Sequence, residues 1–581
     1  MSILVNIPIA LVVFFLPGYA WLFAWGLTQS LGRFGSVALS FVLSICFVSL
    51  MAAALSFVTT QYLEYSIVVL FVVPAVVVLL SALMQHKLPV FAMPSANFTL
   101  LLVLLSVLIY AVFLIAVFWS APIYPASFAS DPVTHAQIVE AIFNGGGRSV
   151  ITHSSYAVGL HFAAAVLMNL LGTNSLQALR ILVSFAILAS IVLIYASARE
   201  LLGDEKLAIC ALIVGAFAMP ADAMHLTLIG TYPNIVVDSI IFAALFSIFS
   251  NMTKPTIRIW PSLAILSLEG VFTHSSYILF LGVLVLTSPI IWWLFRKAHV
   301  STRYLKGVGY AISGVLLGVI AASAFFLKNL ERPLQGYNVV GTGTIPQAVA
   351  VLPILYESFA RNLVFLIKPI NLIAILAGII LIGIRQRSRI GQVFVASWLI
   401  ALVLLCFVSG QTDRFVLFAI LPSTFIVGNL VGNIPDPRAK WKNKISRLLD
   451  RRTAASLIIL LLVATGGFLP LLATAYDPAN RIHQEQVFAS MEWMKQNGCT
   501  AAASIGLGLD YRYLTALTGL PYTTTLVENT TPNKVLQESV SAGFNCVAMG
   551  TTNPIYQSFV ADKAFQAKYR NSEIAIFVIT H

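Results

Sequence analysis

Long apolar stretches separated by short polar segments recur from the N-terminus to about residue 475. A helix needs about 20 apolar residues to cross the hydrocarbon core of a bilayer. Spacing such helices between the polar segments predicts about fourteen crossings. The predicted spans are 3–27, 36–58, 64–84, 98–120, 181–198, 207–219, 235–250, 259–272, 275–295, 308–327, 369–384, 391–409, 415–432 and 453–475.

After these spans the pattern changes to short apolar runs that alternate with helical patterns. It predicts helices at 483–496 and 533–541, and strands at 501–505, 546–549 and 574–579. Alternating strands and helices favour a small α/β sandwich. The predicted fold class is therefore an all-α polytopic membrane domain over residues 1–475, followed by a soluble α/β domain over 476–581.

Composition strengthens the membrane assignment. Hydrophobic residues make up 59% of the 581 positions and charged residues 10%, whereas about a quarter of an ordinary soluble domain is charged. A water-soluble fold cannot bury so much apolar surface, so we expect a multi-pass protein of a cell membrane.

The net charge of +12 does not indicate a nucleic-acid partner, because the basic residues cluster in short loops between apolar stretches. This distribution is the positive-inside signature of cytoplasmic loops. It predicts that both termini and the C-terminal domain lie outside. The basic clusters lie at 296–306, 385–389 and 438–452.

Five polar interruptions then fall on the predicted outer face, at 121–177, 220–234, 273–276, 328–368 and 409–414. Within the first interruption, 156–171 is apolar but too short to cross comfortably. We predict that it forms an interfacial helix lying on the membrane, and we interpret 350–367 in the same way.

Two of the five cysteines fall at the starts of predicted strands, Cys499 and Cys546. Adjacent strands would bring them within disulfide range in an oxidising compartment. Two free buried thiols are an equal alternative. The other three, Cys46, Cys210 and Cys406, lie in apolar helices and are expected to be inert.

The first outer loop contains Asp131 followed by Pro132 and, four residues after the acid, His135. A capping residue followed by proline is a common sequence at the start of a helix, so one interpretation is that Asp131 is only a structural N-cap. Helical spacing also puts Asp131 and His135 on one face. Membrane proteins seldom keep two such groups at one depth without use, which makes them candidate catalytic residues.

A divalent-metal site from Asp131, His135, Asp222 and His225 is a further hypothesis, although no tight ligand motif supports it. Metal analysis and chelation would test it. Without that site, no cofactor is expected.

Near the end of the apolar region, Asp413 and Arg414 lie in a tight turn between two predicted helices. Arg414 can reach the membrane interface or pair with Asp413, or its guanidinium can hold a phosphate bidentately. Arg332 and Arg361 add positive charge to the same predicted face.

Four stretches together carry a resemblance to a known superfamily. They are 130–135 with 155–161, 198–204 leading to 231–234, Thr412–Phe415 with Pro422, and 490–498. In order and sidedness they resemble the GT-C superfamily, integral membrane glycosyltransferases that use lipid-linked donors and include oligosaccharyl-, mannosyl- and arabinofuranosyltransferases.

The resemblance implies a metal-independent, inverting transfer of sugar from a polyprenyl-phosphate donor to a glycan, lipid or protein acceptor at the outer face of the bilayer. Asp131 would act as general base, assisted by His135, and Arg414 or its neighbours would bind the donor phosphate. The expected substrate-binding residues are Arg414, Asp413, His161, Tyr232, Asn234, His274, Arg332 and Arg361.

The chain departs from the superfamily's protein oligosaccharyltransferases, because it has no Trp-Trp-Asp-Tyr-Gly motif and no Asp-x-Asp in the first outer loop. Metal-dependent transfer to asparagine is therefore not expected. A transporter or flippase of lipid-linked glycans is the main alternative, since Asp238 and Glu269 are polar groups within apolar stretches. A non-catalytic scaffold is a third reading.

Overall fold

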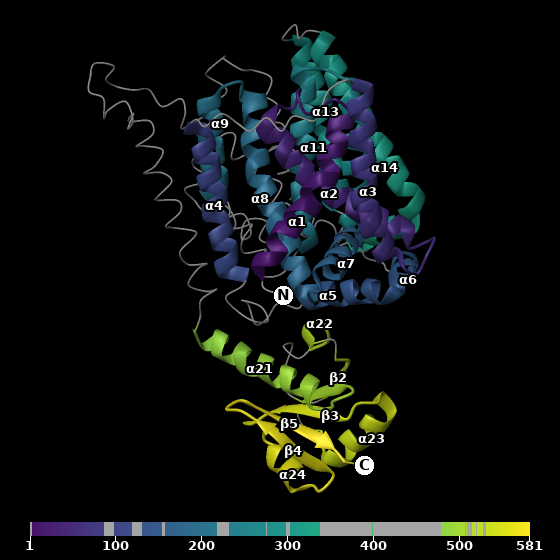
Figure 1. Cartoon of the computed structure of the whole chain (residues 1–581), viewed down its shortest axis with the longest axis vertical. Helices are drawn as coiled ribbons and strands as arrows, with labels where there is room; N and C mark the ends of the chain where they lie inside the picture. Colours follow the sequence, from purple (N-terminus) through teal and green to yellow (C-terminus); the bar gives the residue numbers. More distant parts are fainter. Residues whose placement is uncertain are drawn as a thin grey trace, which may run out of the picture.

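The computed structural model describes residues 3–85, 98–118, 131–153, 157–217, 232–274, 276–297, 302–336, 398, 478–505, 507, 514–518, 520–526 and 530–580. These residues form a helical bundle with a small domain beside one end of it (Figure 1).

Helices occupy the first ten predicted spans. They are α1 (Ile3–Ala24), α2 (Gly32–Leu55), α3 (Tyr62–Gln85), α4 (Phe98–Phe118), α8 (Ser175–Leu202), α9 (Glu205–Phe217), α11 (Tyr232–Thr253), α12 (Trp260–Thr273), α13 (Ser276–Lys297) and α14 (Thr302–Gly336). The last four predicted spans lie outside the described residues apart from Trp398, which is helical. The helical pattern is thus confirmed over this part, and the number of crossings stays a prediction.

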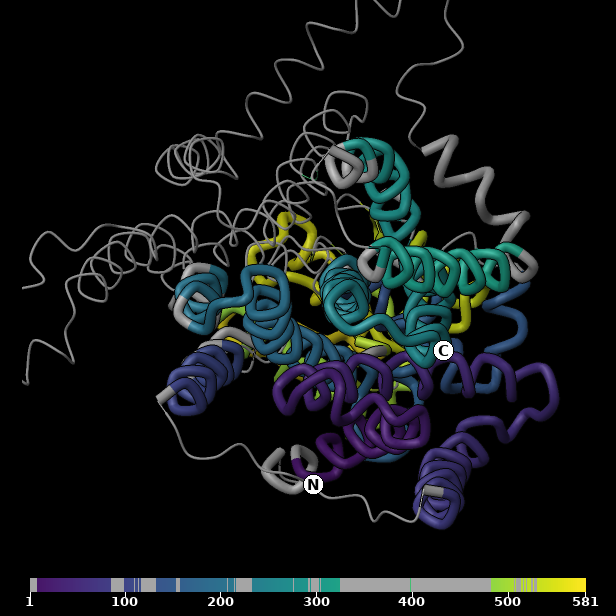
Figure 2. Tube along the Cα trace, turned by 90° about the horizontal axis from the view of Figure 1, so that it is seen from above, coloured from purple at the N-terminus to yellow at the C-terminus, as the bar shows by residue number. Residues whose placement is uncertain are grey.

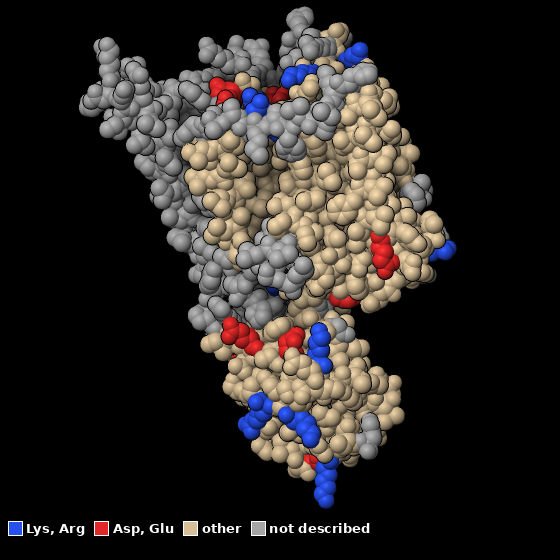
Figure 3. All heavy atoms as spheres, in the orientation of Figure 1, with Lys and Arg blue, Asp and Glu red and all other residues tan. Residues whose placement is uncertain are grey.

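Five helices in the described part of the chain are long and apolar enough to cross a membrane, by length and composition: α2, α3, α8, α11 and α14. The protein is therefore a multi-span membrane protein. One face of the bundle shows a broad band without charged atoms, between charged groups at its two ends (Figure 3). That band matches the apolar layer that a bilayer requires.

The five helices differ in how much protein surrounds them. Only 11% of the apolar window of α3 is buried, against 94% for α11, and α3 lies at the periphery when the bundle is seen from above (Figure 2). Since both sequences are apolar, composition alone does not separate a lipid-facing helix from a central one.

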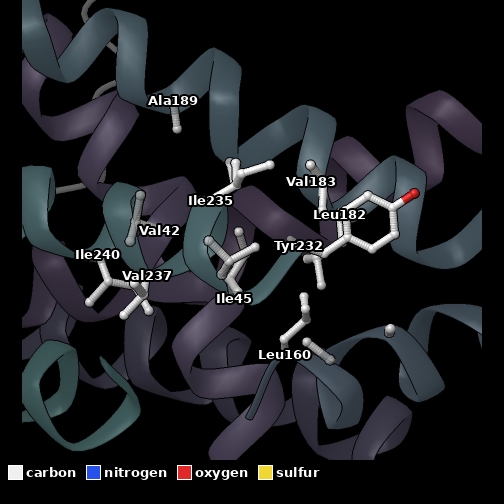
Figure 4. Packing of buried hydrophobic residues seen from close by; sticks show 14 of the residues in the cluster. Val42, Ile45, Leu160, Leu182, Val183, Ala189, Tyr232, Ile235, Val237 and Ile240 are labelled. Carbon is white, nitrogen blue, oxygen red and sulfur yellow. The ribbon is translucent and has the colours of Figure 1, made fainter. Parts of the chain in front are cut away.

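The core of the bundle forms where α2, α8 and α11 meet. Figure 4 shows aliphatic side chains of these three helices packed together with Leu160. The contacting side chains include Val42 and Ile45 from α2, Leu182 and Val183 from α8, and Ile235 and Ile240 from α11, all buried. This packing sets the positions of the helix ends that carry the candidate site.

Short helices cover the end of the bundle next to the C-terminal domain (Figure 1). They are α5 (Asp131–Ala141), a π-helical turn (Ile142–Gly146), α6 (Gly147–His153) and α7 (Gly159–Leu171). Gly145 has φ +88° at the kink between α5 and α6, a conformation that glycine adopts without steric cost.

The predicted helix at 156–171 is present as α7, and its predicted location at the membrane interface stays a prediction. Eleven of its thirteen residues are buried, and α2, α8 and α12 pack around it. Apart from His161 and Asn169 its sequence is apolar, which suits a helix that is surrounded by protein.

The C-terminal region forms a five-stranded mixed sheet with helices. Its elements are α21 (Pro478–Gln496), β1 (Ala502–Ile505), α22 (Leu514–Thr518), β2 (Tyr522–Leu526), α23 (Pro532–Ala542), β3 (Cys546–Gly550), α24 (Tyr556–Ala561), β4 (Phe565–Arg570) and β5 (Ile574–Ile579). The order is β2-β1-β3-β5-β4, with β1 parallel to β2 and β3, and β5 antiparallel to β3 and β4.

The three strands and two helices predicted here are confirmed, and the two edge strands were missed. The edge strand β2 is rich in threonine, and the middle of the edge strand β4 is exposed. Edge strands need few apolar residues because one side lacks a neighbour, so their sequences give a weak signal. The boundary at residue 475 stays a prediction.

Cys499 and Cys546 form a disulfide, with their Cα atoms 5.8 Å apart. This decides between the two alternatives left open by the sequence. The bond is consistent with an extracytoplasmic location of the C-terminal domain. Neither Cys46 nor Cys210 forms a disulfide with another described residue, and Cys406 lies outside the described residues.

Candidate active site

The candidate site is built on α5, which begins at Asp131 and carries His135 one turn later. The predicted helix start and spacing are therefore confirmed at the level of the backbone. Residues four apart lie on the same face of a helix. Residues of neighbouring elements that contact His135 therefore lie within about one helical turn of position 131.

His135 contacts a second histidine from a different helix. The Nδ1 atom of His135 and the Nε2 atom of His161 on α7 are 3.0 Å apart and share a hydrogen bond. Their exposed fractions are 4% and 0%. Two candidate residues separated by 26 positions in the sequence are thus brought together inside the protein.

Tyr232 completes this group from a third element, the start of α11. Its ring centroid lies 6.1 Å from that of His135, and its side chain is fully buried. Figure 4 shows Tyr232 at the edge of the aliphatic cluster, with its hydroxyl directed away from Val42 and Ile240. An apolar body and a polar tip suit a residue at the boundary between a core and a binding site.

Burial lowers the pKa of His135 to about 4, because the charged imidazolium loses its hydration inside the protein. The ring is therefore neutral at pH 7. A neutral imidazole has one N–H donor and one acceptor nitrogen. Its N–H can orient a neighbouring carboxylate.

Two other predicted binding residues are described. Asn234 is buried in the first turn of α11, two residues after Tyr232. His274 ends α12, and its Nδ1 atom contacts both the backbone N–H and the hydroxyl of Ser276. His274 therefore stabilises the turn into α13. Its predicted contact with substrate stays a prediction.

Several predicted site residues cannot be compared with the structure. Arg332 lies in α14, and only its backbone is described. The residues outside the described part are Asp222, His225, Arg361, Asp413 and Arg414. Within the described part, no three His, Cys, Asp or Glu residues form a metal-binding group, and the metal hypothesis stays untested.

The sequence analysis missed Arg180, whose exposed fraction is 3%. It lies in the second turn of α8, which begins at Ser175 rather than near residue 181. Asn174 caps this helix by accepting a hydrogen bond from the N–H of Gln177, at 2.8 Å. Asparagine before a helical run is a recognised start signal, and reading it would have placed Arg180 inside the helix.

The C-terminal domain packs directly on the candidate site's helices. Its helix α22 contacts both α5 and α8, and Leu514 and Leu517 of α22 are buried in the same hydrophobic cluster as the bundle core. Figure 1 shows α22 facing α5. The helix that carries Asp131 and His135 therefore lies between the bundle and the soluble domain.

This architecture is similar to that of solved membrane enzymes. ArnT from Cupriavidus metallidurans in the apo state has a TM-score of 0.51 at 14% identity, covering 83% of this chain and 97% of that chain. The same protein bound to undecaprenyl phosphate has a TM-score of 0.48 at 14% identity, covering 83% and 98%. An Archaeoglobus fulgidus oligosaccharyltransferase has a TM-score of 0.46 at 12% identity, covering 78% and 70%. The predicted similarity to GT-C glycosyltransferases is thus confirmed at the level of the fold.

The chain belongs to DUF6541, described as a family of unknown function, whose sequence profile matches residues 11–425. The match begins within α1, includes the described helices from α2 to α14, and ends before the C-terminal sheet. No curated protein matches the chain.

Proposed function

We propose that this protein transfers a sugar from a polyprenyl-phosphate donor to a hydroxyl group of a cell-envelope glycan, lipid or protein at the outer face of the membrane. The observation that carries the proposal is the convergence of α5, α7 and α11. His135, His161 and Tyr232 meet there, one turn from Asp131, in a bundle whose fold is similar to that of ArnT.

In the proposed reaction Asp131 is the general base. Its carboxylate takes the proton of the acceptor hydroxyl while the hydroxyl oxygen attacks the anomeric carbon of the donor sugar. The bond between that carbon and the phosphate oxygen breaks, and the polyprenyl phosphate leaves with the bonding electrons. A single displacement of this kind inverts the anomeric configuration, and a positioned base accelerates it by about 10²- to 10⁴-fold.

The neighbours of Asp131 have separate proposed roles. His135, neutral because it is buried, orients Asp131. Tyr232 and Asn234 contact the sugar or the acceptor. Arg414, with Arg332 and Arg361, holds the donor phosphate and stabilises the charge that develops on it.

The membrane and the soluble domain divide the substrates between them in this proposal. The lipid tail of the donor lies in the bilayer, and its phosphate lies at the outer end of the bundle. The C-terminal domain covers the acceptor, a role supported by the contact of α22 with α5 and by a disulfide consistent with an extracytoplasmic location.

Transfer of radiolabelled sugar from synthetic polyprenyl-phosphate donors by the purified protein tests this proposal. Asp131→Asn keeps the shape of the side chain but removes its basicity, so we expect transfer to fall by about 10²- to 10⁴-fold. Glu140→Gln is the matched control, because it removes another carboxylate from the same helix, and it should keep most of the activity.

Full activity of Asp131→Asn would contradict the assigned base. If the wild-type protein transferred no sugar across a broad panel of donors and acceptors, yet moved lipid-linked glycans between leaflets of a vesicle, the protein would be a flippase.

A further inference from the structure

The first turn of α7 begins at Gly159, after Val158, whose side chain makes no capping hydrogen bond. The N–H groups of His161 and Phe162 donate to the carbonyl of Val158, at 3.0 and 3.3 Å. The place of this turn in the bundle therefore depends on what packs against Gly159.

Glu269, on α12, lies against this turn. Its exposed fraction is 0%. A Cβ atom added to Gly159 would lie 2.5 Å from the Oε1 atom of Glu269 and 2.7 Å from the Oγ1 atom of Thr273. No side chain larger than hydrogen fits at residue 159 without a shift. The carboxyl group of Glu269 therefore packs closely against Gly159.

Two hydroxyl groups fix this contact. The hydroxyl of Thr273, one turn further along α12, donates a hydrogen bond of 2.8 Å to Oε1 of Glu269. The hydroxyl of Ser49, on α2, donates one of 2.7 Å to the carbonyl of Gly159. The start of α7 is thus held from α12 and α2.

The first turn of α7 carries one residue of the candidate site. His161 is two residues beyond Gly159, and its Nε2 atom contacts Nδ1 of His135 at 3.0 Å. A shift of the first turn of α7 would move His161, and through it His135 and the start of α5. The contact of Glu269 with Gly159 is therefore connected to the position of Asp131 through one hydrogen bond between side chains.

We propose that Glu269 is a positioning residue, which packs against the first residue of α7 from a neighbouring helix and thereby sets the geometry of the His135–His161 pair. This inference rests on the proposed glycosyl transfer for its kinetic consequence. A buried carboxylate in a membrane bundle is costly and is retained for a specific use. Here its use is to hold a helix end rather than to carry a proton or an ion across the membrane.

The kinetic test compares Glu269→Ala and Glu269→Gln with the wild type in the sugar-transfer assay. A misplacement of about 1 Å at a reacting group costs up to about 100-fold in rate. We therefore expect kcat of Glu269→Ala to fall about 10- to 100-fold. KM for the donor should change little, because the donor's lipid and phosphate contact other groups. Glu269→Gln keeps the shape of the side chain, so its kcat should lie between those of the wild type and Glu269→Ala.

A second variant tests the contact itself. Gly159→Ala introduces a methyl group where Oε1 of Glu269 lies, so it should also lower kcat. In the double variant with Glu269→Ala part of the space needed by this methyl group is vacant. The second substitution should then add little to the loss caused by the first, whereas independent effects would add.

Hydrogen–deuterium exchange measured by mass spectrometry gives a readout that needs no activity. Peptides covering 157–165 should exchange faster in Glu269→Ala than in the wild type, with peptides from the middle of α8 unchanged. Asn251→Ala is the matched control. Asn251 is also buried, but it bonds to Gly307 and Thr256, so its loss should lower thermal stability and leave exchange at 157–165 and kcat unchanged.

The outcomes separate the two proposals. Unchanged exchange at 157–165 in Glu269→Ala, or a kcat equal to that of the wild type, overturns the positioning role. A different pair of results would separate the proposals. If the wild-type protein transferred no sugar but Glu269→Ala still exchanged faster at 157–165, the proposed function would be contradicted and the positioning contact of Glu269 would be supported.

Discussion

At the scale of single residues, the chemistry of the candidate site depends on burial more than on residue type. His135 and His161 are ordinary imidazoles in sequence, but both lie inside the protein and share one hydrogen bond. Such a bond requires one ring nitrogen to donate and the other to accept. Protonating both rings would place two positive charges next to each other without water.

This burial predicts a pH dependence of stability. The pKa of His135 is lowered to about 4, whereas an unfolded chain has about 6.5. The unfolded state therefore binds more protons between these values, and stability falls as the pH falls from about 6.5 towards 4. Full stability is present above about pH 6.5.

The measurement is the thermal unfolding midpoint between pH 7.5 and 4.5, for wild type and His135→Gln. Over about two pH units, the proton uptake of His135 in the unfolded state lowers the free energy of unfolding by about 3 kcal/mol. The variant lacks this imidazole, so its unfolding midpoint should vary less with pH. Parallel curves for the two proteins would show that His135 is not buried in this way.

At the scale of helices, close approach depends on small residues at particular positions. On α1, a Cβ atom added to Gly18 would lie 2.1 Å from the carbonyl oxygen of Ser40 on α2. The N–H of Gly18 also donates a hydrogen bond to the hydroxyl of Ser44, at 2.8 Å. Small residues allow helix backbones to approach closely in membranes, where association relies on packing rather than on the hydrophobic effect.

Gly18→Ala should therefore destabilise the bundle by about 1–3 kcal/mol, because the two helices have to separate. Gly309→Ala on α14 is the matched control, since no atom lies within 4 Å of the position of its added Cβ. Replacing an open helical glycine by alanine is expected to be neutral or to stabilise by up to about 1 kcal/mol. Unfolding in detergent, followed by tryptophan fluorescence, compares them. Equal losses of stability would contradict the close contact of α1 with α2.

At the scale of the whole molecule, the two ends of the bundle differ. The soluble domain, α5 and α22 lie at one end (Figure 1). Charged groups gather at the opposite end as well (Figure 3). From the positive-inside rule we predict that the basic segment 296–306 faces the cytoplasm. The C-terminal domain would then lie outside, a location with which its disulfide is consistent.

Cysteine labelling in intact cells tests this orientation. Lys534→Cys on α23 replaces a side chain that is 59% exposed, so a membrane-impermeant maleimide should label it. Thr302→Cys, at the exposed start of α14, should be labelled only after the cells are lysed. The wild-type protein controls for its native thiols. If only Thr302→Cys were labelled in intact cells, the orientation of the protein in the membrane would be the opposite of the predicted one.

Much of the architecture follows from local sequence. The length of an apolar stretch and the thickness of a bilayer together set where helices form, so the ten helices from α1 to α14 that match predicted spans lie close to their predicted positions. The start of α5 at Asp131, and the common face of Asp131 and His135, likewise follow from capping grammar and helical spacing. The pairing of strands in the C-terminal domain and its disulfide were only partly readable, because edge strands carry little apolar pattern.

What only the tertiary structure decided is which helix faces which. A largely apolar helix does not encode how it is rotated about its axis or what surrounds it, so the sequence did not show that α2, α8 and α12 pack around α7. The contacts of His135 with His161 and of Glu269 with Gly159 join residues 26 and 110 positions apart. They depend on the packing of whole helices, and no local pattern in the sequence specifies such packing.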